Sequence, residues 1–125
     1  RKSKVQTIET NMLTIQAKAK SYAEEIESKV WALENGTGEN QKEGKRQDEF
    51  HRRGLEGTVG SREYTVTTAG LQQMGLNELE GQVYKVIFSN DYKTLDVQYP
   101  AGVNYNGTNM TLLSEIQAAL SSESA

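Results

Sequence analysis

The chain has 125 residues, of which 25% are charged, and a formal net charge of −3. This length fits one domain with a modest core, and the small net charge gives no overall attraction to polyanions or anionic membranes. Cysteine is absent, which excludes a disulfide framework, a thiolate zinc site and a cysteine nucleophile. Residues 63–125 carry two Lys/Arg against seven Asp/Glu, so we expect no nucleic acid partner.

Residues 1–34 form the first predicted element, a long amphipathic helix. Asn35-Gly36 can supply the left-handed backbone that closes it. A helix of about 30 residues is about 45 Å long, which is more than a compact remainder needs. Because the chain enters the helix directly at Arg1, we expect that an apolar, membrane-anchoring segment has been removed upstream. The apolar residues recur at steps of three or four and are Val5, Ile8, Met12, Ile15, Ala19, Tyr22, Ile26, Val30 and Leu33.

Residues 35–62 form the second predicted region, a surface loop. Gly, Glu, Gln, Lys and Arg dominate it, and its few apolar side chains include Phe50, Leu55 and Val59. Loops of this length are uncommon in compact domains and are either mobile or functional. We expect local disorder at residues 36–48.

Residues 63–125 form the third predicted region, in which short strands and helices follow one another. Glu63–Thr67 has β character. Thr68 can cap a short helix that Gly75 ends.

The clearest hairpin in the chain follows, with predicted strands at residues 82–88 and 92–99. Pro100 is expected to end the second strand, and residues 104–109 form a polar turn region. In the second strand, apolar side chains alternate with polar ones, as in a sheet buried on one side; they are Leu95, Val97 and Tyr99. Thr111 is expected to cap a last short helix, whose apolar stripe is Leu112, Leu113, Ile116, Ala119 and Leu120.

This order of elements predicts a single domain over residues 1–125 with an α+β fold. The long helix packs on a small antiparallel sheet, with short additional helices beside it. Two hairpin strands are each about 25 Å long, so we expect the sheet to cover only the stripe from Ala19 to Leu33. The rest of the stripe would contact neighbouring molecules, and we predict an assembly interface at Val5, Ile8, Met12 and Ile15.

Two parts of the chain resemble a known family. The run from Val5 to Tyr22, VQTIETNMLTIQAKAKSY, resembles the segment just after the membrane anchor in type IV pilin-like proteins and type II secretion pseudopilins of Gram-positive bacteria. The stretch 68–76, followed by Tyr84-Lys85-Val86 and Asp96-Val97-Gln98-Tyr99, is similar to the C-terminal part of such proteins. The resemblance implies a long N-terminal helix with an antiparallel sheet lying on it. It also implies an upstream apolar helix of about twenty residues, through which subunits assemble into a filament.

The candidate catalytic residues favour no enzyme. His51 is the only histidine, so a Ser-His-Asp triad would depend on this one loop residue and a two-histidine metal site is impossible. Glu24, Glu25 and Glu27 point in different directions on a helix and fit a solvated face. The run Gly54–Gly60 lacks the Gly-Lys-Ser/Thr ending of a phosphate loop. We therefore expect no catalytic residue, no cofactor and no small-molecule substrate.

Three other groups of residues have simpler interpretations than a binding site. Asn90, Asp91 and Asp96 could hold a calcium ion, as some secretion pseudopilins do, but turn chemistry explains Asn90-Asp91 without a metal. Met12, Trp31 and Met74 fit contacts with the core or along a helix. A basic cluster could hold an acidic partner, but interleaved carboxylates nearly cancel its field; it consists of Lys42, Lys45, Arg46, Arg52 and Arg53.

We therefore predict a non-enzymatic, structural subunit of a type IV pilus-like or type II secretion pseudopilus-like filament. It would lie at the cell surface or be extracellular, and it would be membrane-anchored before assembly. Its partners would be other pilin-like subunits and, through the upstream segment, the membrane. The alternative is a surface protein-binding module or a coiled coil with no filament role. The coiled-coil seam would consist of Val5, Met12, Ala19, Ile26 and Leu33, matched by Ile8, Ile15 and Tyr22.

Overall fold

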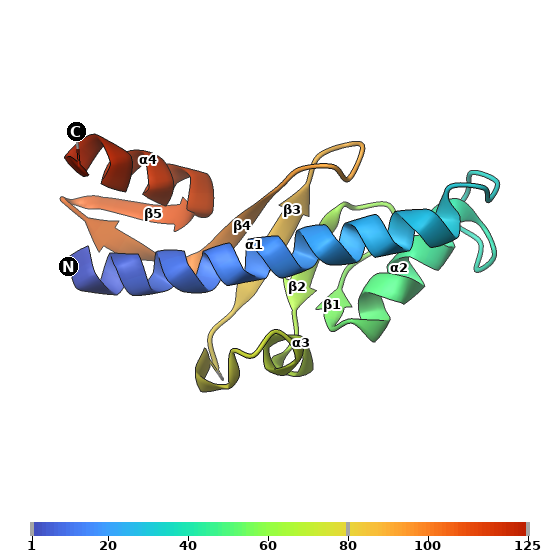
Figure 1. Ribbon diagram of the computed structural model, residues 1–125, viewed down its shortest axis with the longest axis horizontal. Coiled ribbons are helices and arrows are strands. Elements are labelled where there is room, and N and C mark those ends of the chain that lie inside the picture. The colour runs from blue at the N-terminus through green and yellow to red at the C-terminus, as the bar shows by residue number, and fades with distance from the viewer. Residues whose placement is uncertain (1, 80, 125) are drawn as a thin grey trace.

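The computed structural model describes residues 2–79 and 81–124. A long N-terminal helix, α1 (Lys2–Val30), lies across one face of a five-stranded antiparallel sheet. Shorter helices pack beside it, with α2 toward the C-terminal end of α1 and α4 toward its N-terminal end (Figure 1). The predicted α+β class, with a long N-terminal helix on an antiparallel sheet, is confirmed.

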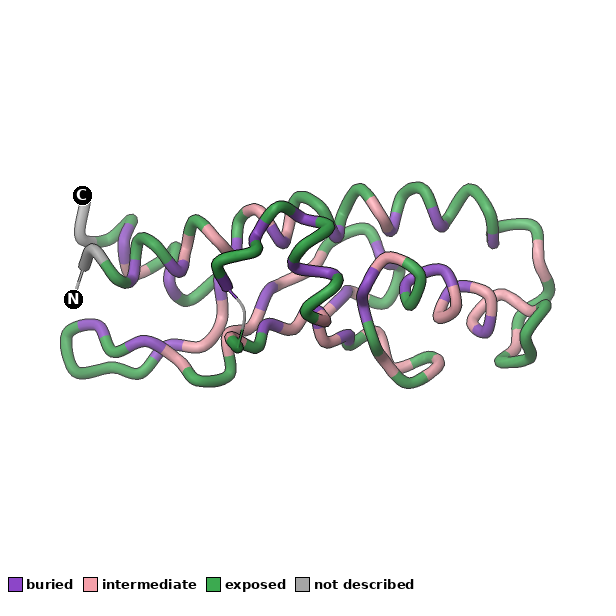
Figure 2. Tube along the Cα trace, turned by 90° about the horizontal axis from the view of Figure 1, so that it is seen from below, coloured by how far each residue is buried: buried purple, intermediate pink, exposed green. Residues whose placement is uncertain are grey.

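Helix α1 is continuous because residues 2–30 contain neither proline nor glycine and keep one apolar face. The buried residues lie on the side of α1 that faces the sheet (Figure 2). The helix ends at Val30 rather than at the predicted Glu34, and the N–H of Leu33 donates to the carbonyl of Val30 in the turn that follows (2.9 Å). The buried positions, none more than 4% exposed, are Val5, Ile8, Met12, Ile15, Ala19, Ala23, Ile26 and Val30.

The predicted surface loop at residues 35–62 is wrong. This region contains helix α2 (Lys42–Arg52), which packs on α1, and strand β1 (Leu55–Glu56). The predicted disorder at residues 36–48 is wrong as well, since backbone hydrogen bonds tie the start of α2 to the preceding segment. One joins the N–H of Lys42 to the carbonyl of Glu34 (2.8 Å).

Helix α2 has no apolar stripe that sequence periodicity could detect. Its buried residues are Gly44, Arg46, Glu49 and Phe50, and only Phe50 is a large apolar side chain. Two of the others are charged and require partners from elsewhere in the fold before they can be buried.

The sheet is a meander in which each strand pairs with its neighbour in sequence, in the order β1-β2-β3-β4-β5. Its remaining strands are β2 (Glu63–Val66), β3 (Tyr84–Phe88), β4 (Leu95–Tyr105) and β5 (Thr108–Leu112). Between β2 and β3 lie helix α3 (Thr68–Gln73) and a 3₁₀-helix, η1 (Asn77–Leu79). Buried Tyr64, Val86 and Val97 face one another across three strands, so one face of the sheet supplies the core.

Strand β4 runs past Pro100 to Tyr105, so the prediction that this proline ends the strand is wrong. The pairing of β4 with β5 shifts register between Gln98 and Val103. Pro100 lies inside that irregular stretch, where the ladder needs no N–H from it. Gly102 in the same stretch has a φ of +76°, a left-handed conformation that glycine adopts without strain.

The polar region predicted as a turn at residues 104–109 does contain a turn, which joins β4 to β5 in a second hairpin. Tyr105 pairs with Thr108, and only Asn106 and Gly107 lie between them. Both have positive φ, 52° and 82°, as two-residue type I′ turns require, and Asn-Gly is a preferred sequence for them.

Helix α4 (Leu113–Ser124) begins beyond Thr111, which belongs to β5, so the predicted Thr111 cap is wrong. The carboxylate of Asp96 binds the first turn instead, since its Oδ1 accepts the N–H of Ser114 (3.1 Å). The carboxylate of Glu115 accepts the N–H of Thr111 (3.2 Å). Two acidic side chains therefore occupy the start of the helix, where its dipole favours negative charge.

Helix α3 packs closely on the segment that joins α2 to β1. Its cap is Thr67 rather than the predicted Thr68, because the Oγ1 of Thr67 accepts the N–H of Gly70 (2.9 Å). A Cβ added to Gly70 would lie 2.3 Å from the carbonyl oxygen of Gly54. The two backbones can approach this closely only because neither residue carries a side chain.

We expect Gly70→Ala to lower the melting temperature, although glycine to alanine inside a helix normally stabilises by about 1 kcal/mol. The added methyl group would displace the Gly54 backbone at a cost of about 1–3 kcal/mol. Thermal unfolding followed by circular dichroism measures the change. Gln72→Ala, at an exposed position of α3, is the control and should not lower the melting temperature. An unchanged or raised value for Gly70→Ala would contradict the close approach.

Candidate functional site

The four residues predicted as an assembly interface are buried within the chain itself. Val5, Met12 and Ile15 are 0% exposed and Ile8 is 4% exposed. The second half of β4, its hairpin with β5, and α4 lie over this part of α1 (Figure 1). The predicted assembly interface is therefore wrong. That prediction ended the sheet at Pro100, so it included no element that covers these four residues.

The coiled-coil alternative depends on the same face of α1. Met12, Ala19 and Ile26 would form the centre of the seam, and each is 0% exposed. A coiled coil through these positions would require α1 to leave its own sheet, so this form of the alternative is wrong.

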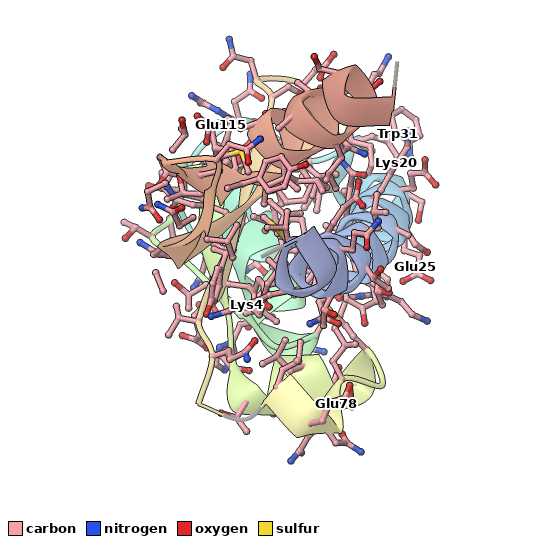
Figure 3. The ribbon with its side chains drawn as sticks, turned by 90° about the vertical axis from the view of Figure 1, so that its left-hand side faces the viewer. Lys4, Lys20, Glu25, Trp31, Glu78 and Glu115 are labelled. Carbon is pink, nitrogen blue, oxygen red and sulfur yellow. The ribbon has the colours of Figure 1, made fainter. Side chains whose placement is uncertain are left out.

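The exposed face of α1 carries charges of both signs. Lys18 and Lys20 precede Glu24, Glu25 and Glu27, and all five are exposed. Figure 3 shows Lys20, Glu25 and Trp31 on the side of α1 that faces away from the sheet. Since its own chain does not cover this side, it is available to a partner.

Trp31 follows directly on α1 and is the most exposed large apolar side chain of the described residues. It is 67% exposed, compared with 50% for Val83 and 39% for Leu13. The sequence interpretation placed Trp31 in a core or helix contact, and this is wrong. Exposed tryptophans stand out because tryptophan is enriched among the residues that dominate binding energy at interfaces.

Four residues of the basic cluster, Lys45, Arg46, Arg52 and Arg53, form ion pairs within the chain. Buried Arg46 donates to Glu27 of α1 (2.8 Å) and to Glu43 (3.3 Å), and its guanidinium lies 4.3 Å from the centre of the Tyr92 ring. Burial alone would lower the pKa of Arg46, but the hydrogen bond to Glu27 and the charge of Glu43 outweigh it, and the pKa is raised. Arg46 therefore joins α2 to α1 and to the β3–β4 turn.

The second buried charge of α2 is Glu49, which is 4% exposed. It accepts a hydrogen bond from Nη1 of Arg53 (2.9 Å) and lies 3.7 Å from the ammonium of Lys45. The hydrogen bond from Arg53 lowers the pKa of Glu49. Arg52 pairs with Asp48 (3.1 Å), so four of the cluster's basic side chains each lie beside a carboxylate.

A groove of about 680 Å³ lies between α1 and the turn that joins β3 to β4. Tyr92, in this turn, has a φ of +61°, which is rare for a bulky side chain. Its hydroxyl lies 3.4 Å from that of Tyr64, and burial raises the pKa of Tyr92. The groove is lined by Lys20, Ala23, Glu24, Glu27, Asp91, Tyr92 and Lys93.

The residues considered for calcium serve separate structural roles. Oδ1 of Asp91 accepts the N–H of Lys93 (3.0 Å) and the hydroxyl of Ser89 (2.8 Å), and these hydrogen bonds lower the pKa of Asp91. Asp96 binds the start of α4 instead. Within residues 2–79 and 81–124, no three His, Asp or Glu side chains are grouped so that they could hold a metal ion.

The residues considered for catalysis also have structural partners. The side chain of His51 is 59% exposed, and its Nδ1 lies within hydrogen-bond distance of the carboxylate of Glu56, which is 48% exposed. The glycine-rich run that begins at Gly54 contains β1 and the backbone contact with Gly70. These residues therefore belong to the junction between α2 and the sheet.

A scan against protein-family models and searches of the curated proteins and of the solved structures found no match to this chain. In the part of the chain that the structure describes, no helix is both long and apolar enough to cross a membrane.

We expect Met12→Ala to destabilise the isolated chain by about 2–5 kcal/mol, since truncating a buried methionine leaves a cavity. An interface residue would instead affect association and leave the stability of the isolated chain unchanged. Urea unfolding measures the difference. Leu13→Ala, one residue further along α1 and 39% exposed, is the control and should cost much less. Equal effects of the two variants would contradict the burial of this stripe.

We expect the stability contribution of Glu49 to depend on pH. Because the pKa of Glu49 is lowered in the folded state, its ionised form stabilises the fold above its unfolded pKa of about 4.3. This contribution is lost as the pH falls through the folded pKa. Glu49→Gln should thus lower the free energy of unfolding by roughly 1–3 kcal/mol at pH 7 and by less at pH 3.

Glu78→Gln, at an exposed position, is the control and should have little effect on the free energy of unfolding at either pH. A Glu49→Gln effect independent of pH would contradict the ionic role.

Proposed function

We propose that this chain is a structural subunit of a type IV pilus-like or type II secretion pseudopilus-like filament. The observation that supports this most is the arrangement of α1. The helix runs unbroken for 29 residues, and β3, β4, α2 and α4 contact it along one side while its other side is exposed. The family resemblance implies such a helix with an antiparallel sheet lying on it.

In this proposal, assembly uses the exposed side of α1 and a helical segment upstream of it. The N-terminus lies at one end of the long axis (Figure 1), so an upstream helix can extend from α1 without passing through the sheet. That helix would anchor the subunit in the membrane before assembly and pack against its counterparts in the filament. The filament would then lie at the cell surface.

A surface protein-binding module with no filament role is the second candidate, and the groove beside Tyr92 favours it. The left-handed backbone of Tyr92 is held in place by Arg46 and by its turn, and strain of this kind persists where the surroundings enforce it. The groove combines apolar surface with lysines and carboxylates, a mixture that is common at protein interfaces. This candidate requires no upstream apolar helix.

We expect the gene to encode an apolar segment of about twenty residues directly before Arg1, and the protein that carries it to form filaments visible by electron microscopy. Since the chain has no cysteine, single cysteines can report which surfaces become covered. Maleimide should label Ala17→Cys, on the exposed side of α1, much more slowly in filaments than in the isolated chain. Glu63→Cys is exposed on the strand β2 and should label at similar rates in both states.

The absence of an apolar segment within a few residues upstream of Arg1 would contradict the filament proposal and favour the binding module. If filaments form but Ala17→Cys labels equally fast in both states, the exposed side of α1 is not the contact surface.

A further inference from the structure

Two pairs of asparagine and glycine lie at opposite ends of the molecule (Figure 1). Asn35-Gly36 lies in the segment that joins α1 to α2, and Asn106-Gly107 forms the turn between β4 and β5. This dipeptide is chemically labile in flexible chains, because glycine has no side chain to keep its backbone nitrogen away from the preceding asparagine. Since the two pairs have the same sequence, the fold around each pair decides how readily it reacts.

The surroundings of Asn35 leave its side chain and the next backbone nitrogen free to react. The side chain is exposed and makes no hydrogen bond with the residues that the structure describes. The N–H of Gly36 likewise has no acceptor within residues 2–79 and 81–124. Neither group therefore has to break a contact before the glycine nitrogen can approach the side-chain carbonyl carbon.

The surroundings of Asn106 oppose the same approach. The N–H of Gly107 donates to the Oδ1 of Asn104 (3.3 Å), and Tyr105 and Thr108 pair on either side of the turn. Asn106 and Gly107 have φ values of 52° and 82°, as in a type I′ turn. In that turn the backbone directs the glycine nitrogen away from the asparagine side chain. The hairpin must therefore open before Asn106 can react.

We propose that Asn35 is a site of spontaneous deamidation and that the β4–β5 hairpin protects Asn106 from this reaction. The backbone nitrogen of Gly36 loses its proton and attacks the side-chain carbonyl carbon of Asn35. The new C–N bond closes a succinimide ring, and the side-chain nitrogen leaves as ammonia with that proton. Water then opens the ring at either carbonyl group and gives aspartate or isoaspartate. The reaction requires only water, and the inference does not depend on the proposed filament.

Deamidation of Asn35 changes a segment to which the start of α2 is bound. The carbonyl of Glu34 accepts the N–H of Lys42 (2.8 Å), and the carbonyl of Gly36 accepts the N–H of Glu43 (2.9 Å). In isoaspartate the main chain passes through the former side chain and gains a methylene group, so these two carbonyls move apart. Aspartate adds a negative charge but leaves the main chain unchanged. Isoaspartate at position 35 therefore loosens the first turn of α2.

The first experiment follows both asparagines in one sample. The folded chain is incubated at mildly alkaline pH, and mass spectrometry of tryptic peptides detects the conversion of amide to acid. Trypsin cuts after Lys29 and Lys42, and residues 94–125 contain no Lys or Arg, so the two sites fall in different peptides. Asn35 should convert about tenfold faster than Asn106, which corresponds to about 1.4 kcal/mol for opening the hairpin.

Two controls show whether the fold causes this difference. In urea both pairs lose their surroundings, and Asn35 and Asn106 should convert at similar rates. Asn40 is exposed in the same tryptic peptide as Asn35 but should keep its amide, because the side chain of Gln41 hinders the attack. Equal rates at Asn35 and Asn106 in the folded chain, or faster conversion of Asn106, would overturn the proposal. A difference that persists in urea would overturn the protective role of the hairpin.

The second experiment measures the effect of the modification on α2. Chromatography separates the isoaspartate form from the unmodified chain, and NMR follows hydrogen exchange at the N–H groups of Lys42 and Glu43. Both should exchange about tenfold faster in the isoaspartate form, since exchange reports local opening. Asn35→Asp carries the same added charge without the longer main chain, and it should exchange like the unaltered chain. Equal exchange in the isoaspartate form and in Asn35→Asp would overturn the effect on α2.

Discussion

Burial of one apolar face of α1 along its whole length is the interaction on which the rest of the structure depends. From Val5 to Val30 the buried positions follow at steps of three or four, and each large aliphatic side chain contributes about 1.5–3 kcal/mol when it is fully buried. Different elements cover successive parts of this face: α4 and β4 toward the N-terminal end, and α2 toward the other end. The helix therefore fixes these elements relative to one another, and this leaves its opposite side free for partners.

The junction between α1 and α2 is held in a different way from the rest. Arg46 and Glu49 are buried charges, and each has a partner of opposite charge within hydrogen-bond distance. Buried ion pairs contribute little net stability after desolvation, but they tolerate few alternative geometries. Because Arg46 also lies over the ring of Tyr92, the network positions the β3–β4 turn beside α1. The groove beside Tyr92 thus depends on charge pairing between elements far apart in the sequence.

Sequence periodicity predicted α1, the α+β class and the hairpin of β3 with β4, because each of these buries a regular pattern of apolar side chains. It missed α2, since Phe50 is the only large apolar residue on the buried face of that helix. It also missed β5, because a proline normally ends a strand, whereas Pro100 lies in an irregular stretch of β4 that needs no N–H. The Asn106-Gly107 pair was the available signal for this second hairpin. These errors led to the predicted interface at Val5 and Ile15, whose cover comes from residues after Pro100.

Trp31 is another residue whose environment sequence periodicity does not predict. It directly follows Val30, which is the last buried position of α1, and neighbouring residues on a helix point about 100° apart. Periodicity therefore separates Trp31 from the apolar stripe, but it does not show whether another element covers the side chain. Only the tertiary arrangement shows that Trp31 is exposed.

The meander order of the strands also determines when this protein can fold during its synthesis. Helix α1 is made first, whereas β4 and α4, which cover its N-terminal half, are made last. At about 5–20 residues per second, the ribosome completes these covering elements roughly 5–25 s after Val5. During that interval the apolar face of α1 in the nascent chain is not yet covered by β4 and α4. A chaperone or a membrane surface thus has time to bind α1 before its own sheet does.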